Sequence, residues 1–216
     1  MLDRSPSDLA HTDTIWHYTS FPAFFSILQN SGLWFTRLDH LRDPFEGRSP
    51  QGFKNHLMQR LEEHTRKGVV SCWTVDTEES DLMWYAYAPA FGVAIQSTKG
   101  QLMSAMSDPK SEQLEVGLVQ YAVDWSQGTP ETYAFLKRNH FKREREFRLY
   151  LPYEYEWEGA TLVEPPPHGR IVGVNLQKLI SVVWVSPTAP NWLVSVVDLA
   201  VKKYMTTRVE VKTRTD

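Results

Sequence analysis

Cysteine is almost absent from this sequence, since Cys72 is the only one among its 216 residues. An internal disulfide is therefore excluded, and the composition agrees with a reducing compartment. The sequence also lacks a signal-peptide pattern and any apolar run long enough to cross a bilayer. We therefore expect a cytoplasmic protein with no membrane partner.

Neither sign of charge is in large excess. Lysine and arginine total 23 and aspartate and glutamate total 26, which gives a formal net charge of -3. This balance argues against broad electrostatic wrapping of nucleic acid, although it leaves room for a local basic patch. The sequence has no Walker-type loop and no Gly-x-Ser-x-Gly elbow. Its seven histidines form no pair with the spacing of metal ligands, so no metal site is predicted.

Apolar and aromatic residues are plentiful. Hydrophobic residues make up 42% of the chain and aromatic residues 12%, including eight tryptophans, which is ample for a sizeable core. The length fits one domain. We predict a loosely ordered, polar segment over 1–12 and a single domain over 13–216.

Hydrophobic periodicity predicts the helices and strands. Strands are expected at 14–18, 33–38, 69–74, 91–96, 114–123, 145–151, 170–175, 182–186 and 207–212, and helices at 21–31, 51–66, 80–88 and 191–205. Ser20 is the expected N-cap of the first helix and Gly32 its stop. Because the order shows no βαβ rhythm, it favours an α+β fold with a mixed, mostly antiparallel sheet and flanking helices.

Alternation in the late strand provides the best local argument for chemistry. In a strand, Glu144, Glu146 and Arg148 point to one face. The opposite face, with Phe147, Leu149 and Leu151, would enter the core. The two carboxylates lie about 7 Å apart along such a strand. Like charges raise each other's pKa, so one carboxylate is a candidate to hold a proton near neutrality. The alternative is a solvated strand face that carries Glu-Arg pairs.

Three other groups of residues are candidates for binding. His17, Tyr18 and Thr19 end the first predicted strand, where side chains are free to meet a ligand. Tyr85 lies in an aromatic helix, which is either a stacking wall for a flat ring or a core helix. Arg37 either clamps a phosphate or pairs with a neighbouring aspartate.

A basic run lies in the second half of the chain, at Lys137-Arg138, Lys142-Arg143 and Arg145. Such a run is usually a solvated face. Its alternative role is to steer a polyanion toward the two glutamates.

Taken together, these segments resemble a bacterial family, the domain-of-unknown-function family numbered 2971. The resemblance rests on Trp16-His17-Tyr18-Thr19-Ser20, Leu33-Trp34-Phe35-Thr36-Arg37-Leu38-Asp39, Asp43-Pro44-Phe45-Glu46-Gly47, Ser71-Cys72-Trp73-Thr74, Leu82-Met83-Trp84, Gly92-Val93-Ala94-Ile95 and Glu144-Arg145-Glu146-Phe147-Arg148-Leu149. It implies kinship but no activity.

A more distant resemblance is to ADP-ribosyltransferases of the DarT type, which modify DNA. It rests on His17 at the end of the first strand, on Met83-Trp84-Tyr85, and on Glu146-Phe147-Arg148-Leu149. It implies the split sheet of that fold and NAD as a co-substrate. The Asp43-Pro44-Phe45-Glu46-Gly47 loop has no counterpart in those enzymes, and Arg148 stands where they usually have an apolar residue.

The same resemblance implies roles for individual residues. Glu146 would stabilise an oxocarbenium-like transition state, and Glu144 would position the acceptor. His17 would bind the adenosine-side ribose, with Tyr18 and Thr19 beside it. The remaining implied contacts are Arg37 on the pyrophosphate and Tyr85 stacked on nicotinamide.

Two other functions stay open at this stage. One is a non-catalytic module that binds a ligand or nucleic acid on the same fold. The other is a metal-dependent nuclease built from Asp43, Glu46, Glu144 and Glu146. The sequence leaves open the oligomeric state and the acceptor, which for a transferase is a nucleic acid or a protein among other classes.

Overall fold

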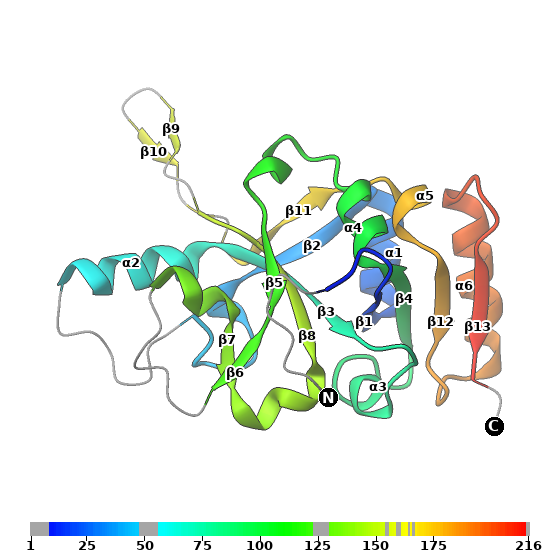
Figure 1. Cartoon of the computed structure of the whole chain (residues 1–216). Coiled ribbons are helices and arrows are strands. Elements are labelled where there is room, and N and C mark those ends of the chain that lie inside the picture. The colour runs from blue at the N-terminus through cyan, green and yellow to red at the C-terminus, as the bar shows by residue number, and fades with distance from the viewer. Residues whose placement is uncertain are drawn as a thin grey trace. The chain divides into compact units, whose positions relative to one another are not determined.

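The structure is a computed structural model that describes residues 9–47, 56–122, 130–153, 156–158, 161–163, 165 and 167–214 (Figure 1). The chain forms two compact units, each built from separate stretches of sequence. Unit 1 comprises 1–33, 73–108 and 171–216, and unit 2 comprises 34–72 and 109–170. The division passes through the strands β2 (Gly32–Arg37), β3 (Val69–Val75) and β11 (Gly169–Gly173). The single domain over 13–216 stays a prediction.

Unit 1 holds a mostly antiparallel sheet with helices beside it. Its other elements are β1 (Thr14–Ser20), α1 (Phe21–Asn30), α3 (Asp81–Tyr87), β4 (Gly92–Thr98), α4 (Lys99–Ala105), α5 (Leu176–Leu179), β12 (Val182–Val185), α6 (Asn191–Tyr204) and β13 (Glu210–Thr213). β1 pairs antiparallel with both β3 and β4, and β12 pairs antiparallel with β4 and parallel with β13. Helix α6 packs beside α1, β12 and β13 (Figure 1).

Unit 2 is built from shorter pieces. Its elements are α2 (His56–Lys67), β5 (Glu115–Leu118), β6 (Gln120–Ala122), β7 (Leu136–Arg138), β8 (Glu146–Leu151), β9 (Glu156–Glu158), β10 (Thr161–Val163) and the 3-10 helices Leu38–His40, Pro109–Gln113, Pro130–Phe135 and Asn139–Glu144. β2 pairs antiparallel with β3, and β8 pairs with β3 and antiparallel with β5. β6 and β7 form a short parallel pair, and β9 and β10 an antiparallel one. The predicted α+β fold with a mixed, mostly antiparallel sheet and flanking helices is confirmed.

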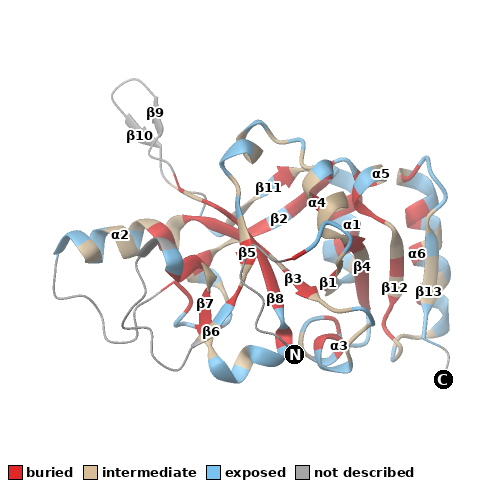
Figure 2. Ribbon diagram, viewed as in Figure 1, coloured by how far each residue is buried: buried red, intermediate tan, exposed pale blue. Residues whose placement is uncertain are grey.

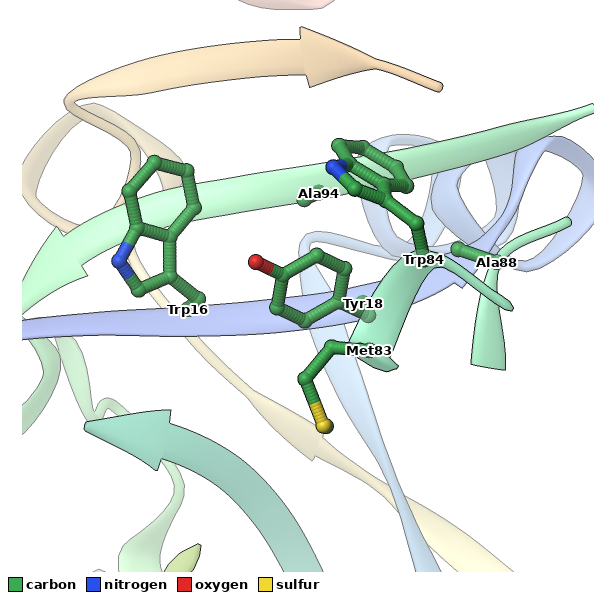
Figure 3. Packing of buried hydrophobic residues seen from close by; sticks show 6 residues of the cluster. All are labelled: Trp16, Tyr18, Met83, Trp84, Ala88 and Ala94. Atoms are coloured by element: carbon green, nitrogen blue, oxygen red, sulfur yellow. The ribbon is translucent and has the colours of Figure 1, made fainter. Parts of the chain in front are cut away.

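Each unit has its own apolar core. In unit 1, Trp16 and Tyr18 of β1 pack with Met83 and Trp84 of α3 (Figure 3). The Tyr18 and Trp84 rings meet edge to face at 5.0 Å, a favourable aromatic geometry. In unit 2, the core contains Leu38, Val70, Ala134 and Tyr150. The sequence pattern predicted α3 as either a core helix or a stacking wall, and Met83 and Trp84 are core residues.

Local signals explain the first helix and one helix that the sequence analysis missed. Ser20 caps α1 by accepting a hydrogen bond from Ala23 N–H at 3.4 Å, as predicted. The C-terminal cap is Ser31, which has a φ of 46°, while Gly32 already begins β2. Helix α4 begins with a capping box in which Thr98 and Gln101 bond each other's backbone N–H. The Thr-x-x-Gln pattern of that box is visible in the sequence.

Two further predictions concern the ends of elements. The predicted loose segment 1–12 falls mostly outside the described residues, but within it Leu9 is buried and its carbonyl accepts a hydrogen bond from Lys99 Nζ at 2.8 Å. The predicted helix over 51–66 is described from His56 onward. None of the helices in the described part of the chain is long and apolar enough to span a membrane.

Gly92, where β4 begins, is required by close packing. A Cβ at this position would lie 1.9 Å from the carbonyl oxygen of Ala88, which is a backbone atom. We therefore expect Gly92→Ala to lower the free energy of unfolding by about 1–3 kcal/mol, measured by urea denaturation. Gly173→Ala is the matched control, because its Cβ would meet nothing closer than the Ser107 hydroxyl oxygen at 3.3 Å. Equal unfolding midpoints for the two variants would contradict this account.

Candidate functional site

A buried cluster of five charged side chains lies in unit 2. The Lys137 ammonium contacts three carboxylates: Glu144 Oε2 at 2.6 Å, Glu146 Oε2 at 2.9 Å and Glu46 Oε1 at 3.4 Å. All four residues are buried. A buried charge is costly unless it is paired and hydrogen-bonded, and the shared ammonium supplies that pairing.

Arg148 is the second cation of this cluster. It is fully buried. Its Nε donates to Glu146 Oε1 at 2.8 Å, and its Nη1 donates to Glu46 Oε2 at 3.1 Å and to the Ala134 carbonyl at 2.5 Å. Its Nη2 lies 2.7 Å from Glu146 Oε1, as an ion pair without the alignment of a hydrogen bond. Glu146 is therefore held at Oε1 by Arg148 and at Oε2 by Lys137.

Four segments of unit 2 bring these side chains together. Strand β8 supplies Glu146 and Arg148, which are two residues apart and share one face. The residue before it, Arg145, has a φ of 46°, an uncommon conformation for a residue with a side chain. It joins Glu144, at the end of a 3-10 helix, to β8. β7 supplies Lys137, and the loop after β2 supplies Glu46.

The loop that carries Glu46 is fixed by a neighbour of Lys137. Arg138 binds Asp43 with two hydrogen bonds, from Nε at 3.0 Å and from Nη2 at 2.9 Å. The Arg138 guanidinium also lies over the Phe45 ring, 4.7 Å from its centroid. Two consecutive residues of β7 therefore hold the Asp43–Glu46 loop at two points.

Two further polar groups contact Glu146. Its backbone N–H donates to the Tyr121 hydroxyl at 2.8 Å, and its carboxylate accepts a hydrogen bond from the Cys72 thiol. Burial raises the pKa of Cys72, and the charge of Glu146 raises it further. Burial likewise raises the pKa of Tyr121. Both groups are therefore protonated and uncharged at neutral pH, and they take part in the cluster only through hydrogen bonds.

The cluster shifts the pKa values of Glu146 and Glu46 in opposite directions. Burial by itself raises the pKa of Glu146, but the charges of Arg148 and Lys137 outweigh burial and hold that pKa at about 2. Burial raises the pKa of Glu46, and the charge of Glu146 adds to that rise against the opposing effect of Arg148. Of the two carboxylates that the sequence offered as candidates to hold a proton, Glu146 is therefore the one that is kept ionised. Because three carboxylates share two cations, the group whose pKa rises is Glu46.

Two sequence-based interpretations of this region are corrected. The strand face that carries Glu146 and Arg148 is not solvated, because every residue of β8 is buried (Figure 2). The Glu-Arg pairing predicted for that face is present, but in the interior. In the basic run, Lys142, Arg143 and Arg145 are exposed as expected, whereas Lys137 is buried. Periodicity did not reveal Lys137 because β7 is only three residues long.

The candidate residues of β1 and α3 belong to unit 1. The His17 ring packs against Trp73, with 5.0 Å between ring centroids. Tyr18 is buried, and its hydroxyl accepts a hydrogen bond from Ser80 N–H at 2.9 Å. Burial raises the pKa of that hydroxyl. Thr19 is half-buried, and Tyr85 is 85% exposed.

Arg37, at the end of β2, forms a close ion pair in unit 2. Its Nε and Nη2 donate to the two carboxylate oxygens of Asp39 at 2.9 and 2.6 Å. Of the two alternatives from the sequence, a phosphate clamp or a pair with Asp39 or Asp43, the pair with Asp39 is present. Among the predicted site residues, the structure thus brings Glu144 and Glu146 together on Lys137 and gives Arg37 an acidic partner of its own.

The carboxylates of the nuclease hypothesis face cations of the chain. Asp43 is bound by Arg138, while Glu46, Glu144 and Glu146 are bound by Lys137 or Arg148. Within the described residues, no group of three or more His, Cys, Asp or Glu side chains is arranged to hold a metal ion.

Comparisons with known proteins add a weak structural similarity. No protein-family model matches the chain, so membership of family 2971 is not confirmed, and no curated protein matches it in sequence. Three solved structures of DarT from Thermus sp. 2.9 are similar to it. In complex with NAD+, the TM-score is 0.45 at 11% identity, over 95% of this chain and 97% of that one.

The other two DarT structures give similar values. In complex with ADP-ribosylated ssDNA, the TM-score is 0.47 at 11% identity, over 99% of this chain and 98% of that one. In complex with carba-NAD+, it is 0.44 at 13% identity, over 95% and 97%. Similarity at this level assigns neither a family nor an activity to this chain.

The opposite pKa shifts of Glu146 and Glu46 predict different effects on stability. The lowered pKa means that the stability contributed by Glu146 is complete above its ordinary pKa of 4.5 and is lost as the pH falls toward 2. At neutral pH, Glu146→Gln should lower the free energy of unfolding by roughly 3 kcal/mol. Because glutamine does not titrate, the variant should not show the loss of stability that acid causes in the parent through Glu146. Urea unfolding across the acid range measures both effects.

Glu46→Gln is the matched control for this pH dependence. Because the pKa of Glu46 is raised, folding favours the protonated form of this side chain. The stability that this form contributes is complete below the ordinary pKa of 4.5 and is lost as the pH rises from there through the raised pKa. We therefore expect Glu46→Gln to lower the free energy of unfolding at neutral pH by less than Glu146→Gln does. The reverse order would contradict the charge assignment of the cluster.

Proposed function

We propose that this protein is an NAD-dependent ADP-ribosyltransferase in which Glu146 stabilises the transition state. The observation that carries the proposal is the state of Glu146: a buried carboxylate that Arg148 and Lys137 keep ionised, with a pKa of about 2. A charge that is fixed before the reaction begins needs no reorganisation when the opposite charge develops.

The proposed reaction requires a fixed negative charge of this kind. Transfer of ADP-ribose breaks the bond between the ribose carbon and the nicotinamide nitrogen, and the bonding electrons leave with nicotinamide. The ribose becomes oxocarbenium-like and positively charged, as in glycoside cleavage. An ionised Glu146 stabilises that charge and accepts a hydrogen bond from a ribose hydroxyl, since a carboxylate has about four acceptor positions.

The proposed role of Glu144 is to position the acceptor. Its carboxylate bonds the same ammonium as Glu146, so the two side chains are oriented together. Together with Arg148, the ammonium lowers the pKa of Glu146, which suits electrostatic stabilisation by that carboxylate rather than proton abstraction. The acceptor itself is proposed to be a nucleic acid or a protein.

The remaining roles follow from the motifs of the sequence. His17 is proposed to bind the adenosine-side ribose with Tyr18 and Thr19 beside it, and Tyr85 to stack on nicotinamide. The exposed ring of Tyr85 suits stacking. Arg37 is proposed to bind the pyrophosphate. Its guanidinium would then contact the pyrophosphate either in addition to the Asp39 carboxylate or in place of it.

A specific observation favours a second candidate, a non-catalytic ligand-binding module. Each carboxylate of the cluster already has a cationic partner from the same unit. Networks of this kind also occur as purely structural features. In that case the cluster supports the fold, and Glu146 has no role in turnover.

Nicotinamide release from NAD distinguishes these candidates. With NAD and single-stranded DNA or protein acceptors, we expect Glu146→Gln to reduce release by about 10²–10³-fold, as for loss of a preorganised electrostatic group. Glu63→Gln, on an exposed position of α2, is the control and should match the parent. Circular dichroism and calorimetric titration with NAD show whether each variant is folded and binds.

The outcomes separate clearly. Equal release by the parent and a folded Glu146→Gln variant would remove the transferase proposal. NAD binding without release by either protein would support the binding module instead.

A further inference from the structure

The outer face of α6 in unit 1 carries an apolar stripe. Trp192 is 57% exposed, Val196 36% and Leu199 67%. Their spacing of four and then three residues places them on one side of the helix. The opposite side, with Leu193, Val197 and Val201, is buried, and Figure 2 shows the two sides in contrasting colours.

A second element extends this stripe. Phe91, directly before β4, is 50% exposed, and its ring lies 5.9 Å from the ring of Trp192. Scattered exposed apolar residues are ordinary on a protein surface, but a contiguous group of large ones marks an interaction site. Because α6 is anchored through its buried side, this face is presented on a rigid element, which lowers the entropy cost of binding.

The stripe continues to a lysine at its C-terminal end. Lys203 lies eleven residues after Trp192, which is close to three helical turns and about 16 Å along the axis. Trp192, Val196, Leu199 and Lys203 therefore form one row, called here the α6 row. The spacing of the row is four, three and four residues, so it reads the same from either end.

We propose that the α6 row is the interface of a homodimer in which two copies of α6 pack antiparallel. A twofold interface requires a patch that complements itself. When the row meets its own reverse, Val196 packs on Leu199 of the other copy, and Lys203 meets Trp192. Each apolar pair and each cation–aromatic pair then occurs twice.

Charge selects the antiparallel arrangement. The C-terminal end of the exposed face carries Lys202 and Lys203, while the one acidic residue of α6, Asp198, pairs with Lys202 at 2.6 Å. In a parallel pair, the lysines of the two copies would lie together and repel. In the antiparallel pair, the Lys203 ammonium moves from the ring of its own Tyr204, 5.1 Å away, to tryptophan, the aromatic side chain that attracts cations most strongly.

Sedimentation equilibrium over a range of concentrations tests the dimer. The parent is expected to associate, and Leu199→Glu to weaken association more than tenfold, as for a central interface residue. Leu57→Glu is the matched control, because Leu57 on α2 is similarly exposed, at 63%, and lies outside the row. Its association should equal that of the parent.

A second pair of variants tests the orientation. Lys203→Ala is expected to weaken association roughly two- to fivefold, the range of an exposed cation–aromatic pair, whereas Lys202→Ala should leave it unchanged. A parent that is monomeric at every concentration overturns the proposal. So does a Leu199→Glu variant that associates like the parent, or a Lys203→Ala variant that associates more tightly, which is the result of relieving repulsion in a parallel pair.

Discussion

The charged interior of unit 2 depends on the ammonium group of Lys137. It contacts the carboxylates of Glu46, Glu144 and Glu146, which come from a loop, a 3-10 helix and a strand. Without a cation at this point, three buried carboxylates would face one another, and the repulsion together with the cost of burial would act against folding. One side chain of a three-residue strand thus joins the Glu46 loop to the segment that carries Glu144 and Glu146, which is far from that loop in the chain.

The same interaction constrains the chemistry of the cluster. With Arg148, it keeps Glu146 ionised, which makes this carboxylate unsuited to donate a proton and suited to stabilise a positive charge. It also directs the carboxylates toward an ammonium and a guanidinium, where a metal-dependent nuclease would need them to face a divalent ion. The proposed transferase and the proposed binding module are both compatible with this arrangement, and they differ only in whether Glu146 takes part in turnover.

In unit 1, aromatic residues form a cluster in the core. Trp16, Tyr18 and Trp84 pack together in one core cluster of this unit, and the Tyr18 hydroxyl accepts a hydrogen bond from the backbone N–H of Ser80. Tyr18 is thus a structural residue of this core whatever its part in binding. The exposed row on α6 belongs to the same unit, and its buried side gives it the rigidity that an interface requires.

The sequence by itself determined the elements and the faces that follow from short-range periodicity. It predicted the β1–α1 junction with its Ser20 cap, the late strand with Glu146 and Arg148 on one side, and the long final helix, because capping and alternation act between residues a few positions apart. Only the tertiary structure decided which cations meet the carboxylates. Lys137 looked like part of a solvated basic run and Glu46 like part of a turn, since nothing in a local pattern shows that a residue is desolvated. Burial, and the pairing of Glu46 with Arg148 and Lys137, arise only when distant segments come together, and these effects shift the pKa values of Glu46 and Glu146.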